Sequence, residues 1–135
     1  MNDVINFLKE NPIQYVATVG LDGNAKVRPL MFYLESNGKL FFCTNNQKPV
    51  YNELKENPNF ELVVANSEFK WCRISGRAEF VDDIDIKQKI IDSNELVKTL
   101  YQTPDNPIFE AFYIKDGKAV IRDFSGEPPK KYDLK

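Results

Sequence analysis

A mainly β fold, an antiparallel barrel with inserted helices, is the fold class that the sequence predicts. About seven short runs rich in β-branched and aromatic residues are separated by turns that contain Gly, Asn or Asp. Helical patterns interrupt these runs at a few points and do not alternate with every strand. This order favours a closed antiparallel barrel over a parallel, doubly wound sheet.

The chain opens with a short amphipathic helix. Apolar residues between Val4 and Leu8 can share one helical face, and the Asn11-Pro12 step ends the helix because a residue before proline avoids helical geometry. β-branched and aromatic residues predict a strand over 13–19. Gly and Asn residues in 20–24 supply a tight reversal into a strand over 25–34, so a first hairpin is expected.

The middle of the chain is expected to continue the meander around a second helix. A turn at 35–39 leads into a strand over 40–44. Residues 47–57 change to helical spacing, and Asn57-Pro58 closes that helix. Strands resume over 60–65 and 70–80.

The last third is expected to hold a long helix and a final hairpin. Asp82 or Asp83 can cap a helix that runs to about Leu100. Strands over 109–114 and 118–124 flank a Lys-Asp-Gly turn, and residues 125–135 are expected to form a loose tail. Residues 1–135 are therefore expected to form a single domain.

Charge and composition argue against several functional classes. Lys and Arg number 18 against 20 Asp and Glu, so the net charge is -2 and the chain lacks the field that attracts nucleic acid or anionic membranes. The start does not resemble a signal peptide and no apolar run could span a bilayer, so a cytoplasmic protein is expected. The absence of histidine removes the commonest general base and transition-metal ligand. A borrowed cofactor is therefore expected to perform any chemistry.

The segment from Thr44 to Pro49 resembles an anion site. It joins a strand end to a helix start and contains a hydroxyl, three amides and an ammonium group. Pro49 is suited to the first helical position, which places Lys48 at the helix cap, where free backbone N–H groups and the positive end of the helix dipole favour a phosphate. In the alternative interpretation, Thr44 and Asn45 only cap the helix and Lys48 is solvated.

The strand that includes Arg28 to Tyr33 combines a cation with apolar residues. Side chains alternate along a strand, so Arg28 shares a face with Leu30 and Phe32. Such a surface suits a flat isoalloxazine ring, whose anionic reduced form is stabilised by a nearby positive charge. Pro29 donates no ladder hydrogen bond and indicates a bulge or an edge. The alternative for Arg28 is a surface ion pair.

These pieces follow one another in an order that resembles the pyridoxamine-phosphate-oxidase-like FMN split-barrel family. The resemblance spans roughly residues 4 to 124, and it depends on the order and spacing of short motifs. The motifs are Arg28-Pro29-Leu30-Met31, Phe41-Phe42-Cys43-Thr44-Asn45, Lys48, Leu54 with Asn57-Pro58, and Trp71-Cys72-Arg73-Ile74-Ser75-Gly76.

The resemblance implies an antiparallel Greek-key split barrel that binds FMN at the interface of a homodimer. Arg28 would lie near the pyrimidine edge of the flavin, Thr44, Gln47 and Lys48 would hold its phosphate, and Trp71 could approach the cofactor. Trp71 could instead belong to the barrel core or the dimer interface. The candidate cofactor-binding residues are Arg28, Pro29, Leu30, Met31, Thr44, Asn45, Gln47, Lys48, Tyr51 and Trp71.

Two departures from the family pattern argue against a pyridoxamine-phosphate oxidase proper. Gln47-Lys48 stands where those oxidases have an Arg-Lys pair, and their long C-terminal substrate segment is missing. The first hypothesis is an FMN-dependent oxidoreductase that acts on a small organic molecule, with NADH or NADPH as a candidate reductant and no catalytic side chain. The alternatives are a non-catalytic FMN or phosphorylated-ligand sensor and, more remotely, an oligonucleotide binder that uses exposed aromatic residues.

Overall fold

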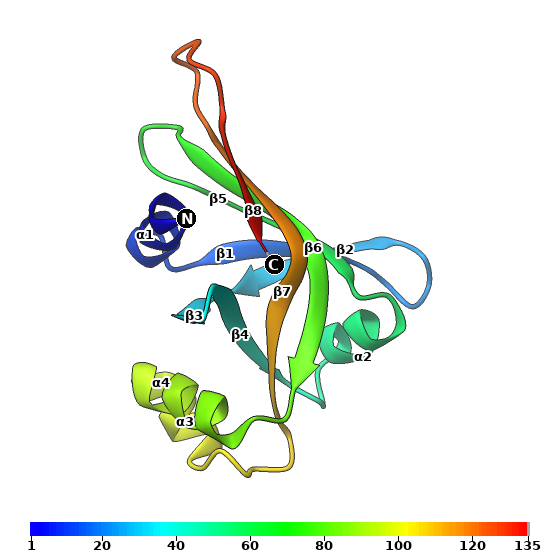
Figure 1. Cartoon of the computed structure of the whole chain (residues 1–135). Coiled ribbons are helices and arrows are strands. Elements are labelled where there is room, and N and C mark those ends of the chain that lie inside the picture. Colours follow the sequence, from blue (N-terminus) through cyan, green and yellow to red (C-terminus); the bar gives the residue numbers. More distant parts are fainter. Residues whose placement is uncertain (135) are drawn as a thin grey trace.

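The computed structural model describes residues 1–134; Lys135 lies outside this range. Eight strands and four helices follow the predicted order for most of the chain (Figure 1). They are α1 (Asn2–Glu10), β1 (Gln14–Val19), β2 (Ala25–Leu30), β3 (Phe32–Ser36), β4 (Lys39–Asn45), α2 (Pro49–Glu56), β5 (Asn59–Ala65), β6 (Trp71–Val81), α3 (Ile84–Ser93), α4 (Glu95–Tyr101), β7 (Phe109–Arg122) and β8 (Lys130–Leu134).

All strand pairs are antiparallel, and the strands follow the order β2-β1-β5-β6-β7-β4-β3. The long strand β7 pairs with β6 on one side. Its other side pairs with β4 over residues 109–113 and with β8 over residues 117–121, so β4 and β8 lie end to end along one edge of β7. The sheet coils on itself, and β2 and β3 are the outer strands at the two ends of this order (Figure 1).

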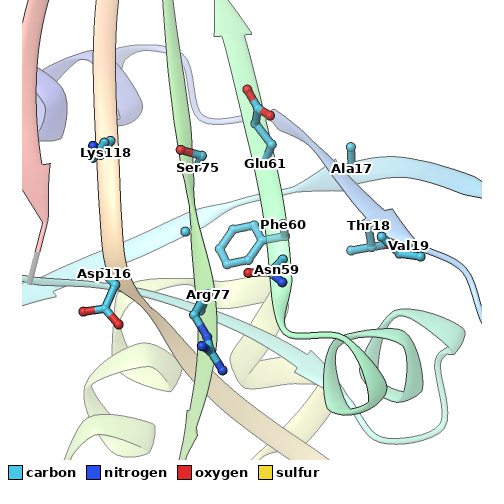
Figure 2. A pocket seen from close by; sticks show the side chains of 11 residues that line it. Ala17, Thr18, Val19, Asn59, Phe60, Glu61, Ser75, Arg77, Asp116 and Lys118 are labelled. Carbon is cyan, nitrogen blue, oxygen red and sulfur yellow. The ribbon is translucent and has the colours of Figure 1, made fainter.

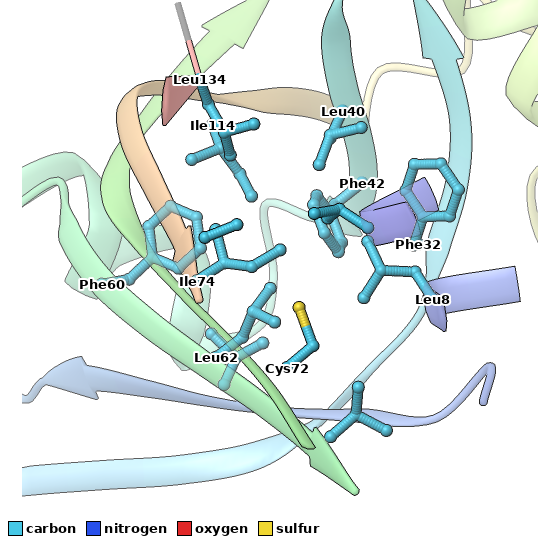
Figure 3. Close-up of a cluster of buried hydrophobic side chains, with 14 of the residues drawn as sticks. Leu8, Phe32, Leu40, Phe42, Phe60, Leu62, Cys72, Ile74, Ile114 and Leu134 are labelled. Atoms are coloured by element: carbon cyan, nitrogen blue, oxygen red, sulfur yellow. The ribbon is translucent and has the colours of Figure 1, made fainter. Parts of the chain in front are cut away.

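Two apolar clusters result from the alternation of side chains along these strands. In β5, for example, every second residue from Phe60 is buried and the residues between are exposed. The larger cluster fills the inside of the curved sheet and includes Phe42, Ile74 and Ile114 (Figure 3). The smaller cluster lies between the other side of β4 and β7 and the pair α3 and α4. Buried aromatic rings account for much of the packing.

One buried side chain joins the two ends of the curved sheet. Gln14 is fully buried at the start of β1. Its Nε2 donates to the carbonyls of Leu8 (3.2 Å) and Asn11 (2.8 Å), and its Oε1 accepts from the backbone N–H of Phe32 (2.7 Å). Gln14 therefore links the end of α1 and the first strand to β3, the outer strand on the opposite side.

The predicted strand over 25–34 is wrong, because it is two strands that part at Met31. β2 pairs with β1, whereas β3 pairs with β4. The chain crosses from one edge of the sheet to the other at this point, and a register shift follows between Phe32 and Leu34. Pro29, which cannot donate a ladder hydrogen bond, precedes the crossing.

The predicted hairpin at 115–117 is also wrong, because β7 runs through it without reversing. Asp116 adopts a φ of 53°, and the β6–β7 register shifts so that Ser75 faces Lys118 but Arg77 faces Lys115. Glycine is needed on both sides of this bulge. A Cβ atom added to Gly76 would lie 2.5 Å from Ile114 Cγ2, and one added to Gly117 would lie 2.7 Å from it.

Two further corrections concern the C-terminal third. The helix predicted over 83–100 is two helices, because Asn94 ends α3 and its side chain caps α4 by accepting from Val97 N–H (3.1 Å). Residues 130–134 of the predicted loose tail form β8, held by the buried side chain of Leu134 and by a bond from Tyr132 Oη to Asp3 (2.8 Å). Within residues 1–134, no helix is long and apolar enough to cross a membrane.

Candidate functional site

A groove of about 810 Å³ lies between the outer strand β2 and the first turn of α2. Its lining combines exposed apolar side chains with charged ones. The lining residues are Leu21, Asp22, Lys26, Val27, Arg28, Pro29, Lys48, Pro49, Val50 and Glu53. Three of the predicted cofactor-binding residues, Arg28, Pro29 and Lys48, thus come together in one groove of a size typical of small-molecule sites.

Lys48 is at the N-terminus of α2, as the sequence predicts. It is the N-cap residue in extended conformation, and Pro49 occupies the first turn. Among the described residues 1–134, no side chain caps this helix end, so backbone N–H groups of its first turn lack side-chain acceptors there. Lys48 is exposed, and within residues 1–134 it forms no ion pair. The helix start therefore offers a positive charge and a dipole end to an anion.

Thr44 supplies a buried hydroxyl close to this helix start in the chain. Its side chain is 4% exposed, and its Oγ1 has no hydrogen-bond partner among the described residues. By strand alternation Thr44 lies on the same side of β4 as Phe42, and Phe42 packs in the cluster that contains Val50 of α2. A buried hydroxyl without a partner is uncommon and requires an explanation.

Arg28 is ion-paired beneath the groove and is not a free cation. Its Nη2 donates to Glu53 Oε1 at 2.6 Å, and its Nη1 donates to Thr18 Oγ1 at 2.7 Å. The Arg28 side chain is 23% exposed and that of Glu53 is 7% exposed. The alternative interpretation of Arg28 is a surface ion pair. The ion pair is confirmed, but it is mostly buried and does not lie at the surface.

The rest of the Arg28 motif divides between groove and core. Pro29 is exposed and lines the groove. Leu30 shares the half-buried face of β2 with Arg28, as predicted, and packs against the larger apolar cluster. Phe32 does not share that face, because it begins β3 beyond the break. Met31 is the half-buried link between the two strands.

Asn45 and Gln47 shape the turn before α2. Asn45 Oδ1 accepts from Gln47 N–H (3.0 Å), and Asn45 Nδ2 donates to Tyr101 Oη (3.2 Å). Gln47 is exposed and its amide donates to Asn46 (2.9 Å). Neither residue lines the groove, so in this structure they hold the turn. The alternative interpretation, in which Thr44 and Asn45 cap the helix, is wrong, because among residues 1–134 no side chain caps α2.

Tyr51 and Trp71 lie away from the groove. Tyr51 packs on Phe80 at 5.1 Å between ring centroids, beside a different cavity of about 440 Å³. Trp71 begins β6 and packs on Phe124 (5.2 Å), whereas α2 leads into the opposite end of the β5–β6 pair, where Asn59 faces Arg77. Trp71 therefore does not reach the groove of its own chain.

The outer face of the sheet forms a second hollow of about 580 Å³. Ala17, Glu61, Ser75 and Lys118 form one row across β1, β5, β6 and β7 (Figure 2). On the other side of Ala17 the same row continues to Val27, which lines the groove. The hollow and the groove therefore meet along one continuous sheet face.

Glu53 is the groove-lining partner of Arg28 that the sequence analysis missed. It is in the apolar stripe of α2, between the buried Val50 and Leu54, at helical spacing. A carboxylate on a buried helical face requires a partner, and this spacing was a usable signal. Val27 carries no comparable signal, because one sequence does not show which apolar residues of an outer strand remain exposed.

The two cysteines are buried, as predicted, and neither is paired. Burial raises the pKa of the Cys43 thiol to about 12 and that of the Cys72 thiol to about 12. Both side chains are therefore protonated at neutral pH and are poor nucleophiles.

A family model described as pyridoxamine 5'-phosphate oxidase matches residues 3–117. The chain belongs to the pyridoxamine 5'-phosphate oxidase family. The match covers the groove and all ten candidate cofactor-binding residues, and it ends within β7. No curated protein sequence matches the chain.

Solved structures share the fold of this family member. A NimC/NimA family protein of Clostridium acetobutylicum has a TM-score of 0.90 and 29% identity, over 99% of this chain and 92% of that one. An FMN-binding, pyridoxamine 5'-phosphate oxidase-related protein of Nostoc punctiforme has a TM-score of 0.70 and 17% identity, over 96% of this chain and 87% of that one. A heme-binding protein of Mycobacterium smegmatis has a TM-score of 0.72 and 13% identity, over 93% of this chain and 54% of that one. The predicted split barrel is confirmed.

Proposed function

We propose that this protein binds FMN in the groove between β2 and α2 and acts as an FMN-dependent oxidoreductase on a small organic molecule. The observation that carries the proposal is the groove itself, an apolar wall on an outer strand with Lys48 at an uncapped helix start. Its volume of about 810 Å³ is within the range of cofactor sites. The Nostoc punctiforme relative, described as FMN-binding, supports the choice of ligand.

The phosphate end of FMN fits the start of α2. Lys48 supplies the positive charge, and backbone N–H groups of the first turn supply donors. The hydroxyl of Thr44, which has no partner in the described residues, is a further donor on the α2 side of β4. A phosphate bound here would accept hydrogen bonds from polar groups that have no partner among residues 1–134.

The ring end of FMN fits the exposed wall of β2. Val27 is 68% exposed, and Pro29 adds an apolar surface without an N–H group. Leu21, in the turn before β2, is 67% exposed and extends this surface. Because β2 pairs with only one neighbour, its free edge can also contact a ligand through backbone groups. When bound, FMN supplies two-electron redox chemistry, with NADH or NADPH as candidate reductant. The protein residues bind the ring, orient it and exclude water from one of its sides.

Replacing Lys48 with alanine is expected to weaken FMN binding by roughly 10- to 100-fold, because a charge-assisted phosphate contact contributes about 1.5 to 3 kcal/mol. Quenching of FMN fluorescence on titration with the protein measures the affinity. Lys55→Ala, on the same helix but outside the groove, is the matched control and should bind as the wild type does. Wild-type protein that fails to bind FMN would refute the proposed function, and equal affinities would remove Lys48 from the site.

A second copy of the chain is the proposed partner, with the flavin at the interface. Large apolar side chains are exposed on the outer face of the paired strands β1 and β5, including Tyr15 (52%), Val19 and Val63. Tyr15 faces Pro29 on one side and Val63 on the other, so this apolar surface reaches the groove. An exposed apolar surface of this kind is typical of protein interfaces. Trp71 would contact the cofactor only from the second copy.

Replacing Val63 with glutamate is expected to raise the dimer dissociation constant by at least about tenfold, because it buries an unpaired charge in the interface. Sedimentation velocity over a range of concentrations measures the change. Leu96→Glu places the same charge at a 63% exposed position on α4 and should leave the dimer intact. A wild-type protein that sediments as a monomer at every concentration would contradict the dimer.

A non-catalytic FMN-binding protein is the second candidate function. It is favoured by the ion pairing of four of the five charged side chains that line the groove, because Asp22 pairs with Lys26 (3.1 Å) and Arg28 pairs with Glu53. These paired groups are suited to holding a ligand and do not offer a free acid or base. Anaerobic reduction of the bound flavin by NADH or NADPH separates the two functions, because an enzyme must turn the cofactor over.

A further inference from the structure

The contacts of Arg28 determine which of its hydrogen-bond donors face the groove. The guanidinium group has five N–H groups. Nη1 uses both of its hydrogens, toward Thr18 Oγ1 (2.7 Å) and the carbonyl of Val16 (3.3 Å). Nη2 donates to Glu53 Oε1 (2.6 Å), and that oxygen also accepts from Thr18 Oγ1 (2.7 Å). Thr18 and Glu53 thus hold one end of the guanidinium plane from below.

The remaining donors form one edge of the guanidinium. Within residues 1–134, neither Nε–H nor the second Nη2–H has a hydrogen-bond acceptor. These two N–H groups are neighbours on one side of a planar, rigid group, which is the geometry that binds two adjacent acceptors at once. Arg28 lines the groove, so this edge is available to a ligand there.

Glu53 also cancels the charge that Arg28 would otherwise present. The two side chains form an ion pair of 2.6 Å, and the carboxylate itself is 7% exposed. In such a poorly hydrated place a unit charge acts strongly on a ligand a few ångström away. With Glu53 present, the pair offers hydrogen-bond donors and little net charge. Without it, the same donors would carry a positive charge.

We infer that Glu53 is a positioning residue of the flavin site: it fixes the free edge of Arg28 toward the two-acceptor pyrimidine edge of FMN and neutralises the guanidinium charge there. This inference rests on the proposed function. Because reduction of flavin adds negative charge to the pyrimidine ring, a neutral pair stabilises the reduced form less than a lone arginine would. Glu53 therefore lowers the midpoint potential of the bound cofactor.

The test is an anaerobic spectroelectrochemical titration of the FMN-loaded protein. Glu53→Gln keeps the shape and the acceptor oxygen but removes the charge. It is expected to bind reduced FMN about tenfold more tightly, relative to oxidised FMN, than the wild type does. That ratio raises the two-electron midpoint potential by about 30 mV. Glu56→Gln removes the same charge from an exposed position of α2 and should leave the potential unchanged.

A double variant, Arg28→Gln with Glu53→Gln, separates charge from hydrogen bonding. It is expected to have the wild-type midpoint potential, because the pair is again neutral, and to bind FMN several-fold more weakly, because the free edge is lost. This variant leaves no unpaired buried charge, so it also serves if Glu53→Gln does not fold.

The outcomes distinguish this inference from the function on which it depends. Wild-type protein that does not bind FMN would refute both. FMN binding with the same potential in wild type and Glu53→Gln would refute the inference alone, and so would a double variant that binds FMN as tightly as the wild type. A positive shift confined to Glu53→Gln supports it.

Discussion

Replacing Gln14 with leucine is expected to lower the free energy of unfolding by about 3 to 5 kcal/mol. The volume changes little, so packing is retained, but the buried Phe32 N–H and Leu8 carbonyl and the partly buried Asn11 carbonyl lose a partner. Each unsatisfied buried polar group costs about 1 to 3 kcal/mol. Urea denaturation followed by far-ultraviolet circular dichroism measures the loss.

The position of Gln14 makes its effect larger than that of other glutamines. It links α1, β1 and β3. Its replacement therefore removes the only side-chain hydrogen bond between β1 and the outer strand β3 within residues 1–134. Gln88→Leu is the control, because Gln88 is exposed and makes one bond, to Asp92 (2.9 Å). Its expected effect is within about 0.5 kcal/mol. Similar losses for the two variants would contradict the linking role of Gln14.

Replacing Arg28 with leucine is expected to cost about 3 kcal/mol of stability. The substitution leaves the Glu53 carboxylate buried without its cation, and breaking a buried pair on one side typically costs about 3 to 5 kcal/mol. The lower end of that range applies because water reaches part of the Arg28 side chain, which is 23% exposed. The double variant Arg28→Leu with Glu53→Leu should recover most of the loss, since apolar replacement of a whole buried pair is often neutral.

The exposed pair Arg73–Glu61 is the comparison for this prediction. Its atoms are 3.3 Å apart, but the two side chains are 55% and 52% exposed. Arg73→Leu is therefore expected to change stability by less than about 1 kcal/mol. Two results would contradict this prediction: a loss of stability for Arg28→Leu as small as that for Arg73→Leu, or a double variant less stable than Arg28→Leu. Either would show that the buried Glu53 carboxylate does not need Arg28 as its partner.

Most of the order of elements could be predicted from the sequence, although the break between α3 and α4 and the strand β8 were missed. The path of the chain through the sheet could not be predicted at two further places. The strand-forming residues of 25–34 do not reveal that Met31 carries the chain from one edge of the sheet to the other. Nothing local requires the break, because each half takes its partner from a distant segment, β1 or β4. The Lys-Asp-Gly sequence predicted a reversal that does not occur, for a similar reason. Pairing with the distant strand β6 holds β7 extended through a bulge at this point.

The candidate site was predictable where the chemistry is local. Lys48 before Pro49 is a helix start that can be recognised from neighbouring residues, and the structure has it there. The pairing of the Arg28 guanidinium depends instead on Glu53, which is 25 residues away in the chain, and on Thr18, which is in a third element. Tyr51 and Trp71 are aromatic residues near the motifs in sequence, but the fold turns both away from the groove of their own chain.

The single tryptophan of this protein is not in the core, and this has a consequence for spectroscopy. The indole of Trp71 is half-buried at the start of β6, beside Phe124, which is 81% exposed. Intrinsic fluorescence will therefore report on the open end of the β6–β7 ribbon, while circular dichroism reports on the sheet as a whole. Emission that changes before the dichroism signal during denaturation would show that this ribbon end frays ahead of the barrel.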